Sequence, residues 1–215
     1  MPNLVFHVER AEVLAFAAVP TLLFKLGIEN RDPELVCSIT LHTQIRIAAT
    51  QRHYRPEEQA RLVEVFGEPH QWGRSLHSMV WTHTTVPVPP FRGRTVIDMP
   101  VTCTYDFEVV STKYFHTLED GDIPLEFLFS GSVFYRVGAG GLQIVQISRE
   151  KETPFRLPLR LWKQLMAHYF PNSVWLRLHQ DTFNRLYDYK ARHRLPTWEA
   201  ALEGLLDTRH KEKPS

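Results

Sequence analysis

LEFLFSGSVFYRV, residues 125–137, is the stretch that decides the fold of this chain. Apolar side chains recur along it with a period of two, at Leu125, Phe127, Phe129, Val133, Tyr135 and Val137. Because successive side chains of a strand point to opposite faces, the pattern predicts a half-buried strand with one face in water. Such strands are typical of antiparallel sheets.

Three further stretches carry the same alternation and predict three more strands. They cover residues 22–28, 35–47 and 101–109. Their apolar members are Leu22, Phe24, Leu26 and Ile28, then Leu35, Cys37, Ile39, Leu41, Ile45 and Ile47, then Val101, Cys103, Tyr105, Phe107 and Val109. A strand over 35–47 would be about 43 Å long at ~3.3 Å per residue, so we expect a bulge near Thr43.

Proline and glycine mark the turns and edges of the predicted sheet. Residues 30–33 read Asn-Arg-Asp-Pro, which predicts a chain reversal. Pro100 interrupts an alternating segment and places it on a sheet edge. The glycine-rich run 138–141 predicts a tight hairpin into a strand over 142–147.

Helical periodicity occurs in two places. Pro56 opens and Gly67 closes a helix inserted among the strands. After Pro158 the apolar residues recur at helical spacing and predict about three helices, with Asp181 and Thr197 as candidate caps.

Strands first and helices last are typical of the α+β class. We therefore expect an antiparallel, sandwich-like β domain over 1–155 with a helical insertion near 56–66. A C-terminal helical cap over 156–210 is expected to pack on it, and residues 211–215 are expected to form a tail.

Composition excludes several classes of protein. The formal net charge of +1 leaves no concentrated positive field for nucleic acid. The sequence contains no apolar run of about 20 residues that would span a membrane. It also shows no secretory signal pattern, so the expected location is the cytoplasm.

The two cysteines, Cys37 and Cys103, lie on the apolar phase of their predicted strands. Their spacing allows an immunoglobulin-type disulfide between sheets. Two buried free thiols are the favoured interpretation, because disulfides are rare in a reducing compartment.

No catalytic or metal motif is recognisable. The eleven histidines lack the spacing of zinc ligands, so we predict neither a metal nor a cofactor. His116 with Asp120 and Asp122 forms a candidate acid/base group or cation loop, although a solvated turn explains them better. Asp106 and Glu108 are candidate paired carboxylates on a polar strand face.

Two groups of residues favour binding to another protein, because tryptophan and arginine are enriched at interface anchors. The first group lies between residues 72 and 94, and its members are Trp72, Trp81, His83, Phe91, Arg92 and Arg94. The second group, Lys190, Arg192 and Arg194, ends a predicted helix. Cations there also complement the helix dipole, which is the simpler explanation of the second group.

Two long stretches resemble a known family. They are CTYDFEVVSTKYFHTLEDGDIPLEFLFSGSVFY, residues 103–135, and YFPNSVWLRLHQDTFNRLYDYKARHRLPTWEAALEGLL, residues 169–206. The chain is similar, over nearly its whole length, to an uncharacterised bacterial family associated with gene clusters of actinobacterial-type NiFe uptake hydrogenases. The resemblance implies an accessory role in assembling, maturing or regulating a hydrogenase, and it supplies no catalytic residues.

The sequence therefore favours a cytoplasmic, cofactor-free binding protein whose partner is a hydrogenase subunit or another maturation factor. One alternative is an enzyme of unrecognised class that uses Asp106, Glu108 and His116 at the sheet rim. A metal carrier is the other alternative. The oligomeric state stays open.

Overall fold

The computed structural model describes residues 2–106, 109–138, 140–174 and 176–211. The chain forms two compact units, Met1–Trp175 and Leu176–Ser215. The first unit holds two antiparallel sheets and most of the helices, and the second holds two helices. The fold is thus mixed α+β with antiparallel sheets and C-terminal helices, as the alternation predicted.

The first sheet has the strand order β1-β2-β5. Its strands are β1 (Leu4–Val13), β2 (Thr21–Asn30) and β5 (Arg94–Thr102). Every pairing is antiparallel. The central strand, β2, is apolar on the face that turns inward and is the most deeply buried of the three.

The second sheet has the order β4-β3-β6-β7, and β8 also pairs with β6. Its strands are β3 (Leu35–Ile47), β4 (Met79–Val88), β6 (Asp122–Arg136), β7 (Leu142–Gln146) and β8 (Glu152–Pro158). One side of β6 pairs with β3, and the other side pairs with β7 and then β8. The glycine-rich hairpin between β6 and β7 is confirmed.

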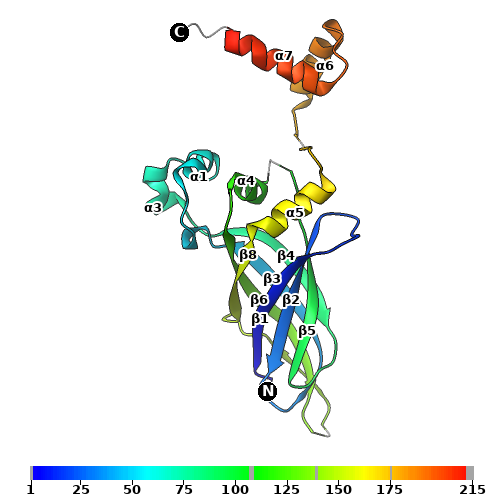
Figure 1. The fold of residues 1–215 in the computed structure, drawn as a ribbon. Coiled ribbons are helices and arrows are strands. Elements are labelled where there is room, and N and C mark those ends of the chain that lie inside the picture. The colour runs from blue at the N-terminus through cyan, green and yellow to red at the C-terminus, as the bar shows by residue number, and fades with distance from the viewer. Residues whose placement is uncertain (1, 107–108, 139, 175, 212–215) are drawn as a thin grey trace. The chain divides into compact units, whose positions relative to one another are not determined.

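The two sheets pack face to face (Figure 1), and aromatic side chains from both lie in the core between them. The rings of Phe6 and Phe129 stack with centroids 4.4 Å apart. Phe24 of β2 meets Phe127 of β6 edge to face at 5.2 Å. These contacts join residues far apart in the sequence, and they form the centre of the core.

Several short helices gather near one end of the sheets (Figure 1). They are the 3-10 turns Ala49–Gln51 and Pro69–Gln71 and the helices α1 (Pro56–Arg61), α2 (Val63–Phe66), α3 (Trp72–Ser75), α4 (Val110–Thr117) and α5 (Leu159–Tyr169). The predicted helix over 56–66 is interrupted at Leu62 and ends at Gly67, whose φ of 74° suits glycine.

A buried ion pair ties this helical end to the sheet. The Arg52 guanidinium donates to the Glu58 carboxylate at 2.9 Å, and Glu58 also accepts the backbone N–H groups of Arg55 and Glu119. Arg52 donates to the backbone carbonyls of Asp120 and Asp122, both at 2.7 Å. The acidic turn that begins at Glu119 is therefore held in place by an arginine.

The predicted strand over 101–109 is wrong in its second half. β5 ends at Thr102, and α4 begins at Val110. The side-chain hydroxyl of Thr104 accepts the backbone N–H of Asp106, whose carbonyl accepts the N–H of Val109, so the chain turns here. Phe107 and Glu108 lie outside the described residues.

The bulge predicted near Thr43 occurs two residues further along the strand, and β3 has a second register shift that was not predicted. The register of β3 shifts against β4 between Ile45 and Arg46 and against β6 between Val36 and Ser38. Thr43 itself pairs regularly and is buried. The long strand thus bends at two places, each on the side of a different neighbour.

The turn over 30–33 is confirmed. The Asn30 side-chain oxygen accepts the backbone N–H of Asp32 at 3.3 Å and that of Asn3 at 3.1 Å. The Asn30 amide group donates to the carbonyl of Glu34. One buried side chain therefore holds both the turn and the start of β1.

The edge strands other than β7 carry prolines or bulges. Pro87 lies in β4, Pro100 in β5 and Pro154 in β8, and each of these strands borders a sheet. The fourth edge, β1, has a register shift between Val8 and Arg10. The expectation that Pro100 marks an edge is confirmed.

The boundary between the units lies later than the sequence suggested. We predicted that the β domain ends at residue 155, which falls inside β8. β8 pairs with β6, and Trp162, Leu165 and Met166 of α5 are buried in the core of the first unit. Strand β8 was missed because two prolines interrupt its alternation, which an edge strand tolerates.

The second unit consists of α6 (Gln180–Arg192) and α7 (Trp198–Lys211), called the helix pair below. The Thr197 hydroxyl accepts the N–H of Ala200 and caps α7 as predicted. The N-cap of α6 is His179, whereas Asp181 lies in the first turn. Residues 212–215 of the predicted tail lie outside the described residues. No helix in the described part of the chain is long and apolar enough to cross a membrane.

Candidate functional site

The aromatic residues of the predicted segment 72–94 are used by the first unit itself. The Trp72 indole N–H donates to the Gly67 carbonyl at 2.9 Å, and its ring packs edgewise on Tyr54 and Phe66. Trp81 meets Phe115 edge to face at a centroid distance of 5.2 Å.

Phe91 is buried, and its backbone forms an isolated bridge with Val36. The polar members of the segment are exposed. His83 lies on β4, whereas Arg94 lies on β5 of the other sheet and pairs with Glu9 at 2.7 Å. Arg92 donates to the carbonyl of Pro33. The structure therefore does not gather these residues into one exposed patch, and their role in binding stays a prediction.

The helix pair offers a different surface. Small residues of α7 lie at its contact with α6: Ala201 is fully buried, and a Cβ added at Gly204 would lie 3.4 Å from the Tyr189 hydroxyl, at ordinary contact distance. The leucines of the same helix, Leu202, Leu205 and Leu206, stay exposed to water.

The exposed apolar side chains of the helix pair form what we call the exposed stripe: Phe183, Tyr187, Trp198, Leu202, Leu205 and Leu206. Within it the rings of Phe183 and Trp198 have centroids 5.3 Å apart, and those of Tyr187 and Trp198 are 6.2 Å apart. Tyr187 is 56% exposed and Leu206 is 62% exposed. Large aromatic and leucine side chains so open to water are typical of contact surfaces.

The predicted cations Lys190, Arg192 and Arg194 lie at the C-terminal end of α6. The Lys190 amine stands 5.5 Å from the centre of the Trp198 ring, so this one member of the group contacts the exposed stripe. The sequence indicates the apolar faces of these helices but not their exposure, because a helical apolar pattern alone does not show whether a partner surface exists within the chain.

Of the candidate acid/base residues, the structure places His116 in a pocket but does not place Asp106 there with it. His116 and Tyr105 line a pocket of about 380 Å³ together with Trp162, Lys163 and Phe170. Burial lowers the pKa of His116, and the nearby charges of Lys163 and Arg61 lower it further, so the ring is neutral at pH 7. Asp106 is not among the described residues that line this pocket, and Glu108 lies outside the described residues.

The acidic turn and the two cysteines have contacts and burial that account for them without a catalytic or metal-binding role. Asp120 pairs with Arg55 at 2.8 Å. Cys37 and Cys103 are free thiols, and burial raises the pKa of Cys103 to about 12. Among the described residues, no group of three or more His, Cys, Asp or Glu side chains is placed to hold a metal ion.

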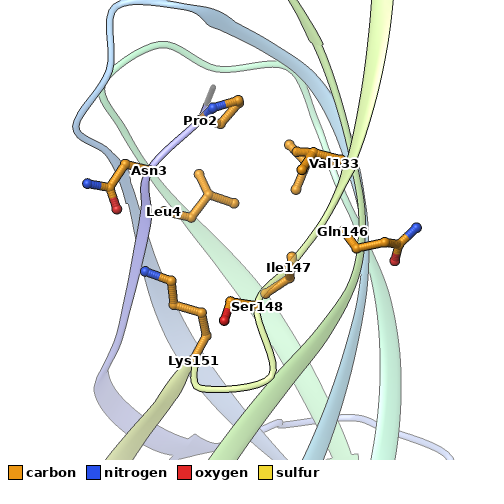
Figure 2. A pocket seen from close by; sticks show the side chains of 9 residues that line it. Pro2, Asn3, Leu4, Val133, Gln146, Ile147, Ser148 and Lys151 are labelled. Carbon is orange, nitrogen blue, oxygen red and sulfur yellow. The ribbon is translucent and has the colours of Figure 1, made fainter.

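A pocket of about 250 Å³ opens between the two sheets beside the start of β1 (Figure 2). Its floor is apolar and consists of Leu4, Val133 and Ile147, all of them buried. Its rim includes Asn3 and Lys151, and Figure 2 shows the Lys151 side chain extending alongside Leu4 toward β1. No sequence motif pointed to this site, because its walls come from three separate parts of the chain.

The fold and these surfaces define the class of the protein: a two-sheet antiparallel α+β protein with an appended helix pair and a small apolar pocket. Over residues 1–214 the chain matches the family described as "Family of unknown function (DUF6084)", and it belongs to that family. Among curated proteins no match is found.

Two kinds of solved structure are similar to this chain at low scores. A solution structure of a "putative late embryogenesis abundant (LEA) protein" is 17% identical, with a TM-score of 0.34, and the match covers 74% of this chain and 72% of the other. A crystal structure of a beta-glucosidase from Kluyveromyces marxianus is 8% identical, with a TM-score of 0.24, covering 72% of this chain and 15% of that one.

Proposed function

We propose that this chain is a non-enzymatic accessory protein that binds another protein through the exposed stripe of its helix pair. The observation that supports the proposal most is the stripe itself, since its six large apolar side chains are between 36% and 62% exposed to water. Two helices alone bury little apolar surface, so covering this stripe with a partner provides a favourable free energy of binding.

The chemistry of the stripe selects the kind of partner. Lys190 lies over the Trp198 ring, and Arg192 and Arg194 follow it at the C-terminal end of α6, so the partner surface is expected to be apolar with acidic residues nearby. The resemblance to a hydrogenase-associated family suggests a NiFe hydrogenase subunit or a maturation factor as that partner. We place the interaction in the cytoplasm, where a reducing environment keeps Cys37 and Cys103 as thiols.

Affinity purification of the tagged full chain from its native host tests the proposal. We expect a hydrogenase subunit or maturation factor to co-purify in stoichiometric amount. The variant Tyr187→Ser with Leu206→Ser, which changes the two most exposed members of the stripe, should reduce recovery of the partner at least tenfold.

The matched control is Leu142→Ser with Ile144→Ser on β7. These two side chains are 56% and 60% exposed, so the control removes two apolar side chains of similar exposed fraction from the first unit. It should leave recovery unchanged. Equal loss in both variants would show that the stripe is not the binding surface, and the absence of any such partner would overturn the accessory role itself.

A further inference from the structure

The floor of the pocket between the sheets consists of buried side chains from both sheets. Leu4 comes from β1, Val133 from β6 and Ile147 from the segment after β7, so both sheets contribute buried apolar side chains. The backbone around it is fixed: the Asn3 carbonyl accepts the N–H of Arg31, and the Ile147 N–H donates to the Gly131 carbonyl. The cavity is therefore part of the folded sandwich and does not depend on a loop closing over it.

The loop between β7 and β8 places one cation at the mouth of this pocket. The Lys151 N–H donates to the Ser148 carbonyl at 3.1 Å, and the Lys151 carbonyl accepts the N–H of Phe129 at 2.9 Å. Both backbone groups of Lys151 are thus held, so its side chain starts from a fixed point on the rim (Figure 2).

Lys151 is the only formally charged side chain among the nine described residues that line the pocket. Its amine forms no ion pair within the part of the chain that the structure describes. An unpaired ammonium beside an apolar cavity is complementary to an amphipathic anion, with the charge at the mouth and the apolar part inside.

We propose that this pocket binds a short- to medium-chain aliphatic monocarboxylate, with the alkyl chain over Leu4, Val133 and Ile147 and the carboxylate on the Lys151 amine. The volume of about 250 Å³ selects a small ligand, because pockets for drug-sized molecules measure roughly 300–1,000 Å³. The proposal is independent of partner binding by the helix pair, which involves other residues.

Titration of the full chain with sodium octanoate tests the site by NMR, followed at the backbone amides of Leu4, Val133 and Ile147. We expect saturable shifts at these three amides. Within the series butanoate, hexanoate and octanoate, affinity should rise about fourfold per added methylene, the gain expected from burying one methylene group.

Two variants distinguish the contribution of the Lys151 charge to octanoate affinity from that of general positive charge on the loop between β7 and β8. Lys151→Gln should weaken octanoate binding about tenfold, because it removes a charge-assisted contact, and should leave binding of uncharged octan-1-ol unchanged. Arg149→Gln removes the same charge from the same loop, at a residue that does not line the pocket, and should leave octanoate binding within twofold of the original chain.

Three results would overturn the proposal. The first is the lack of saturable shifts at the three amides. The second is an equal loss of octanoate affinity in Lys151→Gln and Arg149→Gln, which would indicate general attraction to the loop. The third is affinity that does not change with chain length, which would show that the apolar floor is not occupied.

Discussion

Helices α5 and α7 carry the same kind of apolar stripe in two different surroundings. Trp162 of α5 is 2% exposed because two sheets and α4 lie beside it, whereas Trp198 of α7 is 36% exposed. Within the second unit, α7 has only α6 to pack against. The spacing of apolar residues therefore determines which face of a helix is apolar, while the amount of structure nearby determines whether that face is covered.

We expect the largest difference in stability between variants of the two tryptophans. Trp162→Ala should lower the free energy of unfolding of the full chain by about 4 kcal/mol, because it opens a cavity in the core. Trp198→Ala should lower it by less than ~1 kcal/mol, because its ring is already partly hydrated. Urea denaturation followed by circular dichroism measures both values. Similar losses for the two variants would contradict the contrast between the units.

Buried and exposed ion pairs extend the comparison to charges. Glu58→Gln should destabilise the chain by about 3 kcal/mol, because it leaves the Arg52 charge buried without its carboxylate. Glu64→Gln is the matched control, since Glu64 is largely exposed in its pair with Lys113 and such pairs contribute ~0–1 kcal/mol. Equal effects in urea denaturation would show that the Arg52–Glu58 pair does not hold the helical end.

The same carboxylate makes stability depend on pH. Burial opposes ionisation of Glu58, but the N–H groups of Glu119 and Arg55 and the Arg52 charge outweigh it and lower its pKa below the ordinary value of 4.5. A lowered pKa in the folded state adds stability that is present above pH 4.5 and is lost as the pH falls through the folded value. Glu58→Gln should remove this part of the acid sensitivity, as measured by melting temperatures between about pH 3 and pH 7. An unchanged pH profile would argue against it.

Two glycines, Gly131 of the first unit and Gly204 of the second, extend the comparison of the units to the backbone. An added Cβ at Gly131 of β6 would lie 1.9 Å from the Thr40 carbonyl oxygen, and the φ of 131° disfavours any other residue. We therefore expect Gly131→Ala to cost about 2 kcal/mol.

Gly204→Ala is the counterpart in the helix pair and has the smallest expected effect. Its Cβ would make an ordinary contact with the Tyr189 hydroxyl, and alanine favours a helix by ~1 kcal/mol over glycine. Hydrogen exchange of the α7 amides should slow by up to about fivefold. Faster exchange would mean that the helices already touch at this position without room for a methyl group.

The sheets were predictable from the sequence because their signal is local. At Leu22, Phe24 and Leu26, or at Phe127 and Phe129, a period of two is enough to identify a strand and its buried face. The α+β class, the turn at Asn30 and the hairpin after β6 followed from equally local rules.

The failures have physical causes that a local pattern does not contain. Cys103 and Tyr105 continue the alternation of β5, yet Tyr105 packs on Trp162 and Phe170 after the strand has ended. The apolar surroundings of these two side chains were predicted correctly. The strand was predicted to continue through them, but it ends at Thr102.

The candidate sites depend even more on distant parts of the chain. The pocket joins Leu4, Val133 and Lys151, which only the folded sandwich brings together. Trp72 and Trp81 looked like interface anchors in the sequence but pack within the first unit, whereas the exposed aromatic residues of α6 and α7 looked like ordinary core.

The prolines and the bulge on the sheet borders have a consequence for how any partner can approach. A strand from another chain can extend a sheet only where a border strand offers a regular row of free N–H and C=O groups. Pro87, Pro100 and Pro154 each remove a donor from such a row, and the register shift of β1 bends the remaining border of the first sheet. Backbone pairing with another molecule is thereby hindered along these four strands, and the short strand β7, which has no proline and a regular register, is the border that stays open to such pairing.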